Sequence, residues 1–339
     1  MLTRRTLLAA ALLSSCTDAG TGSSVPTATR TGDPPAPVRG APFSLTVMSW
    51  NVMTQGLGPD WYDASMPRED HDWNTRAAVV RRWLQFTDPD VVGFQEALGV
   101  TDAHGRPSNL MVTMLPDRGW ANVDHFLPIM YRASMFDLAD AGVVQIYPGS
   151  DESPWQRYCS WARLVRRGTG AQLFVFNTHL QPFQTAAVAA IRARTVSTLI
   201  GHLHRLDPDY SVPAVLTGDL NARSDETRPV FREHLSRLNA DGWRNSAALA
   251  RRDLTQVPGA STLNGFGAKV DGRWRYRLIS SGGRDYDYVW VRKATAVATW
   301  RTVLGPGVRT LTVGGHRYPF FADGPVPSDH CPVLAAITV

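Results

Sequence analysis

The segment Gly218-Asp219-Leu220-Asn221 carries a carboxylate and an amide two positions apart, just after the apolar run 212–216. The apolar run predicts a buried strand, and side chains two positions apart on an extended chain point to the same side. Asp219 and Asn221 could therefore act on one bound group. Gly, Asp and Asn are also the usual residues of a plain turn, so this segment alone leaves both interpretations open.

Five further segments place polar side chains where a predicted strand ends, which is where rigid scaffolds commonly present functional groups. They are Ser49-Trp50-Asn51, Phe94-Gln95-Glu96, Asn177-Thr178-His179, Tyr286-Asp287-Tyr288-Val289 and Ser328-Asp329-His330-Cys331-Pro332. Together they supply carboxylates, amides and imidazoles, which bind hard metal ions and transfer protons. No cluster of Cys and His has the spacing of a zinc site. The combination favours a site over a set of unrelated turns.

In this order and at this spacing, the six segments resemble those of the endonuclease/exonuclease/phosphatase superfamily. The resemblance covers essentially all of residues 43–339, which we predict to be one catalytic domain. It implies an α/β (α+β) four-layer sandwich, in which two mixed β-sheets pack face to face with helices on the outside. It also implies metal-dependent hydrolysis of phosphoester bonds.

The resemblance further implies a role for each polar residue near the metal. Asn51 and Glu96 are expected to bind the ion together with Asp329, and Mg²⁺ suits such oxygen ligands, with Mn²⁺ as the alternative. Asp219 is expected to position or activate the attacking water, and Asn221 to bind a phosphate oxygen. A single ion of this kind polarises the phosphoryl oxygen and steadies the leaving oxygen.

Two imidazoles complete the expected site. The resemblance places His330 beside the phosphate and Asp287 behind it, because a facing carboxylate fixes the tautomer of the ring and raises its proton affinity. His179 is the second imidazole, suited to stabilise transition-state charge or to protonate the leaving group. Basic side chains near the site are candidates for phosphate binding: Arg132, Arg157, Arg163 and Arg223.

The substrate stays open at this point. Abasic-site endonucleases of the superfamily usually carry an acid where this chain has Met53 and an Asn where it has His179, so the chain is more similar to the DNase, sphingomyelinase and phosphatase members. A nuclease or phosphodiesterase of low sequence specificity is the leading interpretation. A phosphomonoesterase or sphingomyelinase-like phospholipase acting on phospho-sugars or lipid head groups is the second. The complete set of site residues argues against a third, a non-catalytic surface binding protein.

Strand and helix patterns alternate along the chain without an internal repeat. Apolar and β-branched runs predict strands at 43–50, 91–94, 126–132, 143–147, 158–165, 173–177, 212–216, 286–291 and 332–339. Helical spacing of apolar residues predicts helices at 76–86, 185–204 and 228–238. Several strands follow one another directly, which favours a sandwich over a regular doubly wound sheet.

The first residues resemble a bacterial lipoprotein signal. Arg4-Arg5 precedes a short apolar stretch, and Leu13-Ser14-Ser15-Cys16 follows it, so we expect residues 1–16 to end at a lipidated Cys16. An ordinary secretory peptide is the alternative, and Sec and twin-arginine export both remain open. Residues 17–42, rich in Gly, Pro, Ser and Thr, predict a disordered tether. The domain would then stand on the outer face of the cytoplasmic membrane or in the cell envelope.

Composition sets broader limits. A chain of 339 residues with 43% hydrophobic residues can bury a large core. Its net charge of +5 is too weak to indicate nucleic acid by itself, and nothing points to a protein partner. Beyond the signal, Cys159 and Cys331 are expected to be two separate buried thiols, because two lone cysteines make no disulfide framework.

Overall fold

The computed structural model of the protein describes residues 41–53, 73–97, 100–101, 107–108, 119–121, 127–257, 260–264, 268–270, 273–275, 286–313, 316–321 and 327–339. The predicted signal peptide and residues 17–40 of the predicted tether lie outside these ranges. Within the described part of the chain, no helix combines the length and the apolar character needed to cross a membrane.

The first large sheet has seven strands and contains the N-terminal and C-terminal strands of the domain. Its order is β12 (Arg252–Asp253), β16 (Ala296–Thr302), β19 (Val333–Thr338), β1 (Ser44–Asn51), β2 (Val91–Gln95), β6 (Ile129–Tyr131) and β5 (Gly119–Ala121). β1 runs parallel to β2 and antiparallel to β19. The sheet is therefore mixed, as predicted.

The second large sheet has six strands. Its order is β11 (Arg244–Asn245), β15 (Asp287–Arg292), β10 (Ala214–Asp219), β9 (Gln172–His179), β8 (Arg157–Arg166) and β7 (Phe136–Tyr147). β9 and β10 are parallel, and their other neighbours are antiparallel. Every residue of β9, β10 and β15 is buried, as expected for strands covered on both faces.

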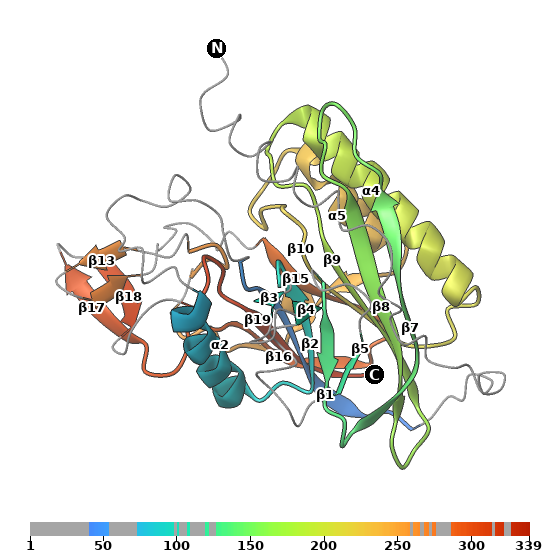
Figure 1. Cartoon of the computed structure of the whole chain (residues 1–339), viewed down its shortest axis with the longest axis horizontal. Coiled ribbons are helices and arrows are strands. Elements are labelled where there is room, and N and C mark those ends of the chain that lie inside the picture. The colour runs from blue at the N-terminus through green and yellow to red at the C-terminus, as the bar shows by residue number, and fades with distance from the viewer. Residues whose placement is uncertain are drawn as a thin grey trace.

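Two small sheets lie outside this pair. One contains β13 (Ala268–Val270), β14 (Arg273–Arg275), β18 (His316–Phe321) and β17 (Arg309–Val313), and the other pairs β3 (Val100–Thr101) with β4 (Pro107–Ser108). Figure 1 shows the four-stranded sheet standing apart from the main body, beyond helix α2 (Trp73–Thr87).

The large sheets pack face to face, and helices cover their outer surfaces (Figure 1). Side chains of both sheets, such as Val47 and Val215, share the central core. Helix α2 packs on the outer face of the seven-stranded sheet through residues such as Trp83. Helices α4 (Ala186–Leu206) and α5 (Pro229–Ala240) cover the outer face of the other sheet, and α6 (Ser246–Leu249) is a single turn that contacts β15 and β16. The predicted four-layer sandwich is confirmed.

Each large sheet contains one strand–helix–strand unit whose two strands are parallel. In the first sheet this unit is β1, α2 and β2, and in the second it is β9, α4 and β10. Thr185 caps the start of α4, because its side chain accepts a hydrogen bond from the amide of Val188. Parallel strands end at the same edge of their sheet, so these two units bring four strand ends, and the polar residues on them, toward one region.

A polar network crosses the core behind those strand ends. Gln95 Nε2 donates to Asn177 Oδ1 at 2.7 Å, and Asn177 Nδ2 donates to the carbonyl of Phe94 in the opposite sheet at 2.6 Å. Thr217 Oγ1 donates to Asn177 Oδ1 at 3.1 Å. These groups are fully buried, and buried polar groups are stabilising only when they are paired. The network therefore joins the two sheets at a defined position.

Gly93 makes this close approach of the two sheets possible. A Cβ atom at Gly93 would lie 1.9 Å from Thr217 Oγ1 and 2.8 Å from Asn177 Oδ1. We expect Gly93→Ala to lower the free energy of unfolding by about 2 kcal/mol or more, since overpacking of a tight core costs roughly 1–3 kcal/mol. Urea denaturation measures the change.

The control for Gly93→Ala is Gly201→Ala in α4, where the atom nearest to the added Cβ lies 3.9 Å away. It should stabilise by about 0.5–1 kcal/mol. A Gly93→Ala protein with the same free energy of unfolding as the wild type would contradict the close approach of the two sheets at Gly93.

Candidate active site

Three of the predicted residues lie in one row across adjacent strands of the six-stranded sheet. Asp219, the last residue of β10, pairs with His179 of β9 on one side and with Asp287 of β15 on the other. Side chains that lie directly opposite on neighbouring strands project from the same face of a sheet. All three are buried and lie on the face that meets the other sheet. The register alone thus places two carboxylates and one imidazole together.

The seven-stranded sheet supplies the facing residues. Asn51, at the end of β1, donates from Nδ2 to Glu96 Oε1 at 3.0 Å and to Asp219 Oδ2 at 3.2 Å. The Oδ1 atom of Asn51 accepts the amide of Met53 at 3.0 Å. His179 lies 3.8 Å from Glu96 Oε1 through Nδ1 and 3.5 Å from Asp219 Oδ2 through Nε2. The Asn51 amide therefore joins the carboxylates of the two sheets.

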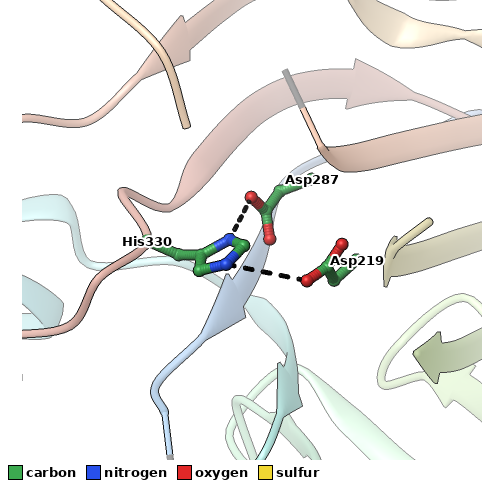
Figure 2. A group of neighbouring side chains, drawn as sticks. All are labelled: Asp219, Asp287 and His330. Carbon is green, nitrogen blue, oxygen red and sulfur yellow. Dashed lines mark hydrogen bonds and ion pairs between the residues drawn. The ribbon is translucent and has the colours of Figure 1, made fainter. Parts of the chain in front are cut away.

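His330 and Asp287 form a close acid–imidazole pair, shown with Asp219 in Figure 2. His330 Nδ1 lies 2.8 Å from Asp287 Oδ2, and His330 Nε2 lies 3.7 Å from Asp219 Oδ2. Two contacts hold the His330 backbone: its amide donates to Ser328 Oγ, and its carbonyl accepts the indole N–H of Trp50. The expected contact between Asp287 and His330 is present in the structure.

Asp219 is unusually basic for a carboxylate. Burial is the largest cause and raises its pKa to about 7, with the charge of Asp287 acting in the same direction. The His330 charge and hydrogen bonds from Asn221 and Asn51 oppose this rise. A carboxylate with a pKa near neutrality suits proton transfer at neutral pH.

The two imidazoles differ in charge. Burial disfavours a charged His330, but the charges of Asp287, Asp329 and Asp219 outweigh burial and raise its pKa well above the ordinary value. His330 is therefore cationic at neutral pH. Burial, followed by the charges of Arg157 and His330, lowers the pKa of His179 well below the ordinary value, so His179 is neutral. His330 can therefore donate from both ring nitrogens, whereas neutral His179 donates from one nitrogen and accepts on the other.

Arg157 adds a buried cation to this group. Burial lowers its pKa to about 10, although the negative charges of Glu96 and Asp219 oppose that change. Its Nε–H is buried and has no hydrogen-bond partner among the described residues. Arg157 is thus a charged donor next to the carboxylates and can bind an anion.

Glu96 follows β2 directly and Asn221 lies two residues after the end of β10, and both have left-handed backbone conformations, with φ of 55° and 50°. Such angles are uncommon for residues other than Gly and carry some strain. At Asn221 the turn is stabilised because its amide donates to Asp219 Oδ1 at 3.0 Å. The sharp turns set these side chains at the strand ends.

Asn221 and Asp329 take part in the site less directly than expected. Asn221 Nδ2 donates to the carbonyl of Leu180 at 2.9 Å, so part of its donor capacity holds the backbone next to His179. Ser328 Oγ donates to the carbonyl of Asn51 at 2.7 Å and lies 3.3 Å from Asp329 Oδ1. Asp329 also acts on His330 through its charge.

Arg132 lies away from this group. Its side chain pairs with Asp88 at 2.6 Å and with Asp90 at 3.0 Å. Asp90 comes just before β2, whereas Glu96 comes just after it, so the strand separates the two ends by roughly 17–20 Å. The expectation that Arg132 binds the phosphate is therefore wrong: its partners belong to the opposite edge of the sheet.

Arg163 also lies away from the site, whereas Arg223 lies two residues after Asn221 and stays a candidate. Arg163 pairs across the sheet with Phe174, five residues before His179, so it lies in mid-strand about 17 Å from that edge. Arg223 is paired with Asp225 through two hydrogen bonds of 2.9 and 2.8 Å. Of the four candidate arginines, Arg157 is the one whose pKa is affected by the charges of Glu96 and Asp219.

A buried arginine outside the predicted set supports the site. Arg76, on α2, donates to the carbonyls of Val52, Met53 and Pro327 and so fixes the segments that lead from Asn51 and into Ser328. It is 1% exposed. Its position on the apolar stripe of the predicted helix, one turn before Val80, indicates that Arg76 is buried. A buried cation needs specific partners, so this position could have marked it as a supporting residue.

The site can accommodate a divalent cation. Its carboxylates offer the oxygen atoms that hard cations prefer, and Asp287 Oδ1 is buried without a hydrogen-bond partner among the described residues. Ligand atoms of Asp219, Asp287 and His330 all lie within 4.8 Å of one another. His330 already uses Nδ1 to bond Asp287 and carries a positive charge, which would repel a cation. The side of the site around Glu96 is therefore the better place for one.

Two packed mixed sheets with a site of acids and imidazoles at one edge define a phosphoesterase of the sandwich type. Residues 48–330 match the Endonuclease/Exonuclease/phosphatase family, and the chain belongs to it. It is 24% identical to Nocturnin of Xenopus laevis over 304 residues, 85% of this chain and 71% of that protein.

Two of the solved structures with the same fold come from Bacteroides thetaiotaomicron. A family member of that species has a TM-score of 0.63 and 21% identity, covering 88% of this chain and 98% of its own. A mannosyl-6-phosphatase of strain VPI-5482 has a TM-score of 0.62 and 20% identity, and the match covers 86% of this chain and 99% of the phosphatase chain. At this identity the likeness concerns the fold.

Proposed function

We propose that the protein is a divalent-metal-dependent hydrolase of phosphodiester bonds in nucleic acid, with low sequence specificity. The observation that carries the proposal is the joint placement of Glu96, Asp219, the His330–Asp287 pair and Arg157 at one sheet edge. A phosphoryl group needs cationic and donor groups for its oxygens, and its attacking water needs a base. The site offers both within a few ångströms.

Each residue has a distinct task in this proposal. Asp219, with its pKa near 7, orients the attacking water and takes its proton. Cationic His330 donates from Nε2 to a phosphate oxygen, and Asp287 keeps the ring in place. Arg157 binds another oxygen of the same phosphate. His179 is neutral and stabilises the developing charge as a hydrogen-bond donor.

The metal belongs at Glu96, with Asn51 and Asp329 as the other expected contacts. Mg²⁺ binds few carboxylates plus water and substrate oxygens, which suits the 21% exposed side chain of Glu96. When bound, the ion neutralises charge on the phosphate and on the leaving oxygen. In the present hydrogen bonding the Asn51 oxygen accepts from Met53, so Asn51 contributes chiefly by orienting Glu96 and Asp219.

A substrate screen tests the proposal directly. The purified protein with Mg²⁺ should hydrolyse single-stranded or double-stranded DNA, or RNA, faster than mannose 6-phosphate, inositol phosphates or sphingomyelin. The fold likeness to a mannosyl-6-phosphatase makes a phosphomonoester the second candidate. Preferential release of inorganic phosphate from mannose 6-phosphate would replace the nuclease proposal with that one.

Metal dependence gives a separate prediction. EDTA should abolish hydrolysis and excess Mg²⁺ or Mn²⁺ should restore it. Glu96→Ala should raise the metal concentration for half-maximal activity by at least about 10-fold, because even indirect partners of a metal ligand change affinity 10–100-fold. Titration of activity with Mg²⁺ measures this. Glu233→Ala, on the exposed surface of α5, is the control. Full activity in excess EDTA would contradict the mechanism.

Attachment to the cell envelope is a further part of the proposal and rests on residues 1–16 alone. Leu13-Ser14-Ser15-Cys16 has the small residues and the Cys of a lipidation site. In a bacterial host, the full chain should incorporate labelled fatty acid, and Cys16→Ser should remove the label. Cys159→Ser is the control, because that thiol lies in the buried core. Equal labelling of Cys16→Ser and the wild type would contradict the anchor.

A further inference from the structure

Two aromatic side chains meet on the surface close to the candidate active site. Phe183 is 40% exposed, and the ring of Trp155, which is half-buried, lies with its centroid 5.2 Å away at an angle of 42°. Covering the exposed part of the Phe183 ring with another apolar group is favourable in water. The pair therefore forms an apolar surface that a flat group can cover.

The chain positions of these two residues place them beside the site. Trp155 is two residues before Arg157, and Phe183 is four residues after His179. Since consecutive Cα atoms are 3.8 Å apart, these separations are at most about 8 Å and 15 Å. Gln184, next to Phe183, donates from Nε2 to the carbonyl of Asn221 at 2.7 Å. The loop with Phe183 thus lies against the segment that follows Asp219.

A buried arginine fixes the loop that carries Phe183. Arg192, on α4, is 0% exposed and donates from Nη1 to the carbonyls of Gln181 at 3.0 Å and Phe183 at 2.8 Å. Its Nη2 donates to Gln184 Oε1 at 3.3 Å. Burial lowers the pKa of Arg192 to about 10, so it is charged at neutral pH. A buried cation is costly unless it is well paired, and here it is paired with this loop. The backbone of Phe183 is held while its ring stays in solvent.

We infer that Phe183 and Trp155 form a recognition subsite that stacks on a nucleobase of the substrate. Stacking on aromatic side chains tolerates any base, because every base has a π-face, and this agrees with low sequence specificity. Arg157 lies within two residues of Trp155, so one surface can take the base while the adjacent cation takes the phosphate. The fixed loop reduces the entropy lost on binding. The inference rests on the proposed function and adds to it what the enzyme recognises beside the phosphate.

The test uses two single-stranded oligodeoxynucleotides of equal length. One carries thymine at every position, and the other has tetrahydrofuran residues without bases. Phe183→Ala should lower kcat/KM on the thymine strand by about 10-fold, within the roughly 5–150-fold range of base–aromatic stacking, and should leave the base-free strand nearly unchanged. Phe183→Trp should restore most of the loss. Phe86→Ala removes a similarly exposed phenylalanine, 44% exposed, on α2 and should change neither rate.

Fluorescence anisotropy with the same strands in EDTA separates binding from hydrolysis. If neither strand is hydrolysed but Phe183→Ala weakens binding of the thymine strand alone, the subsite stands and the proposed nuclease activity fails. Equal losses on both strands would mean that the ring contacts sugar or backbone, which overturns the inference. No loss on either strand, in rate or in binding, overturns it as well.

Discussion

Asp219→Asn should lower turnover by at least about 10³-fold while the protein stays folded. The carboxylate accepts hydrogen bonds from Asn51 and from the Asn221 amide, and two imidazole nitrogens lie 3.5 and 3.7 Å away. An amide of the same shape keeps the packing but cannot take a proton, and positioned proton transfer contributes about 10²–10⁴-fold. The kcat on the best substrate of the screen, at saturating metal, measures the effect.

Thermal unfolding of Asp219→Asn in EDTA separates chemistry from stability. The pKa of Asp219 in the folded state is about 7, above that of the unfolded chain, so the folded state loses stability as pH rises from about 4 through 7. At pH 8 the uncharged variant avoids this loss, and its Tm should equal or exceed that of the wild type.

Asp207→Asn is the matched control for Asp219→Asn. Asp207 is a buried carboxylate that accepts the amides of Ser211 and Val212 before β10, so its loss should lower Tm and leave kcat unchanged. An active Asp219→Asn enzyme would exclude the proposed role.

The second large effect concerns His330 and Asp287. His330→Ala should lower turnover by at least about 10²-fold, because it removes the cationic donor next to Asp219. Asp287→Ala should cost less, since His330 remains but loses the carboxylate that orients and charges it. The double variant should fall close to His330→Ala alone, because residues that act as one unit are strongly non-additive. The kcat of all three variants at saturating metal gives the comparison.

A second acid–imidazole pair in the protein supplies the control. His204 Nε2 lies 2.7 Å from Asp241 Oδ1 on the outer helical layer, and His204 is partly exposed. His204→Ala removes an imidazole with the same kind of partner and should leave kcat unchanged. If the losses of His330→Ala and Asp287→Ala simply multiply in the double variant, the two residues act independently and the proposed unit is wrong.

Most of the core elements could be predicted because their local pattern and their tertiary environment agree. The predicted helix 185–204 is α4, Ala186–Leu206, where a capping threonine and a regular apolar stripe point to the same ends. Strands buried on both faces gave continuous apolar runs, as in β10 and β15. Cys159 and Cys331 are buried and free, as expected.

Elements with little apolar patterning were missed. β7 is an edge strand and begins at Phe136, seven residues before the predicted start, because its first half carries exposed residues such as Asp137 and Asp140. Strand β16, Ala296–Thr302, was also missed, since its buried residues are separated by less buried ones and its register contains a bulge. Strand edges depend on neighbours that the local sequence does not reveal.

The site residues could be predicted as a set but not as a contact network. Strand ends with acids, amides and imidazoles pointed to Glu96, Asp219 and His330. Which arginine reaches them depends on register: Arg157 and Arg132 both adjoin strands, but Arg132 adjoins the far end of its strand. The orientation of the Asn51 amide likewise depends on Met53, a backbone contact that no sequence pattern indicates.

The hydrogen bond from Trp50 to the carbonyl of His330 joins residues 280 positions apart, and the bond from Asn51 to Asp219 joins the two sheets across 168 positions. Contacts between such distant residues form only after long loops have closed, which makes the folding of β-rich domains slow. Catalytic competence must therefore appear late in refolding, after the first and last strands have paired and both sheets have docked. A partly folded chain can contain every helix and still lack a working centre.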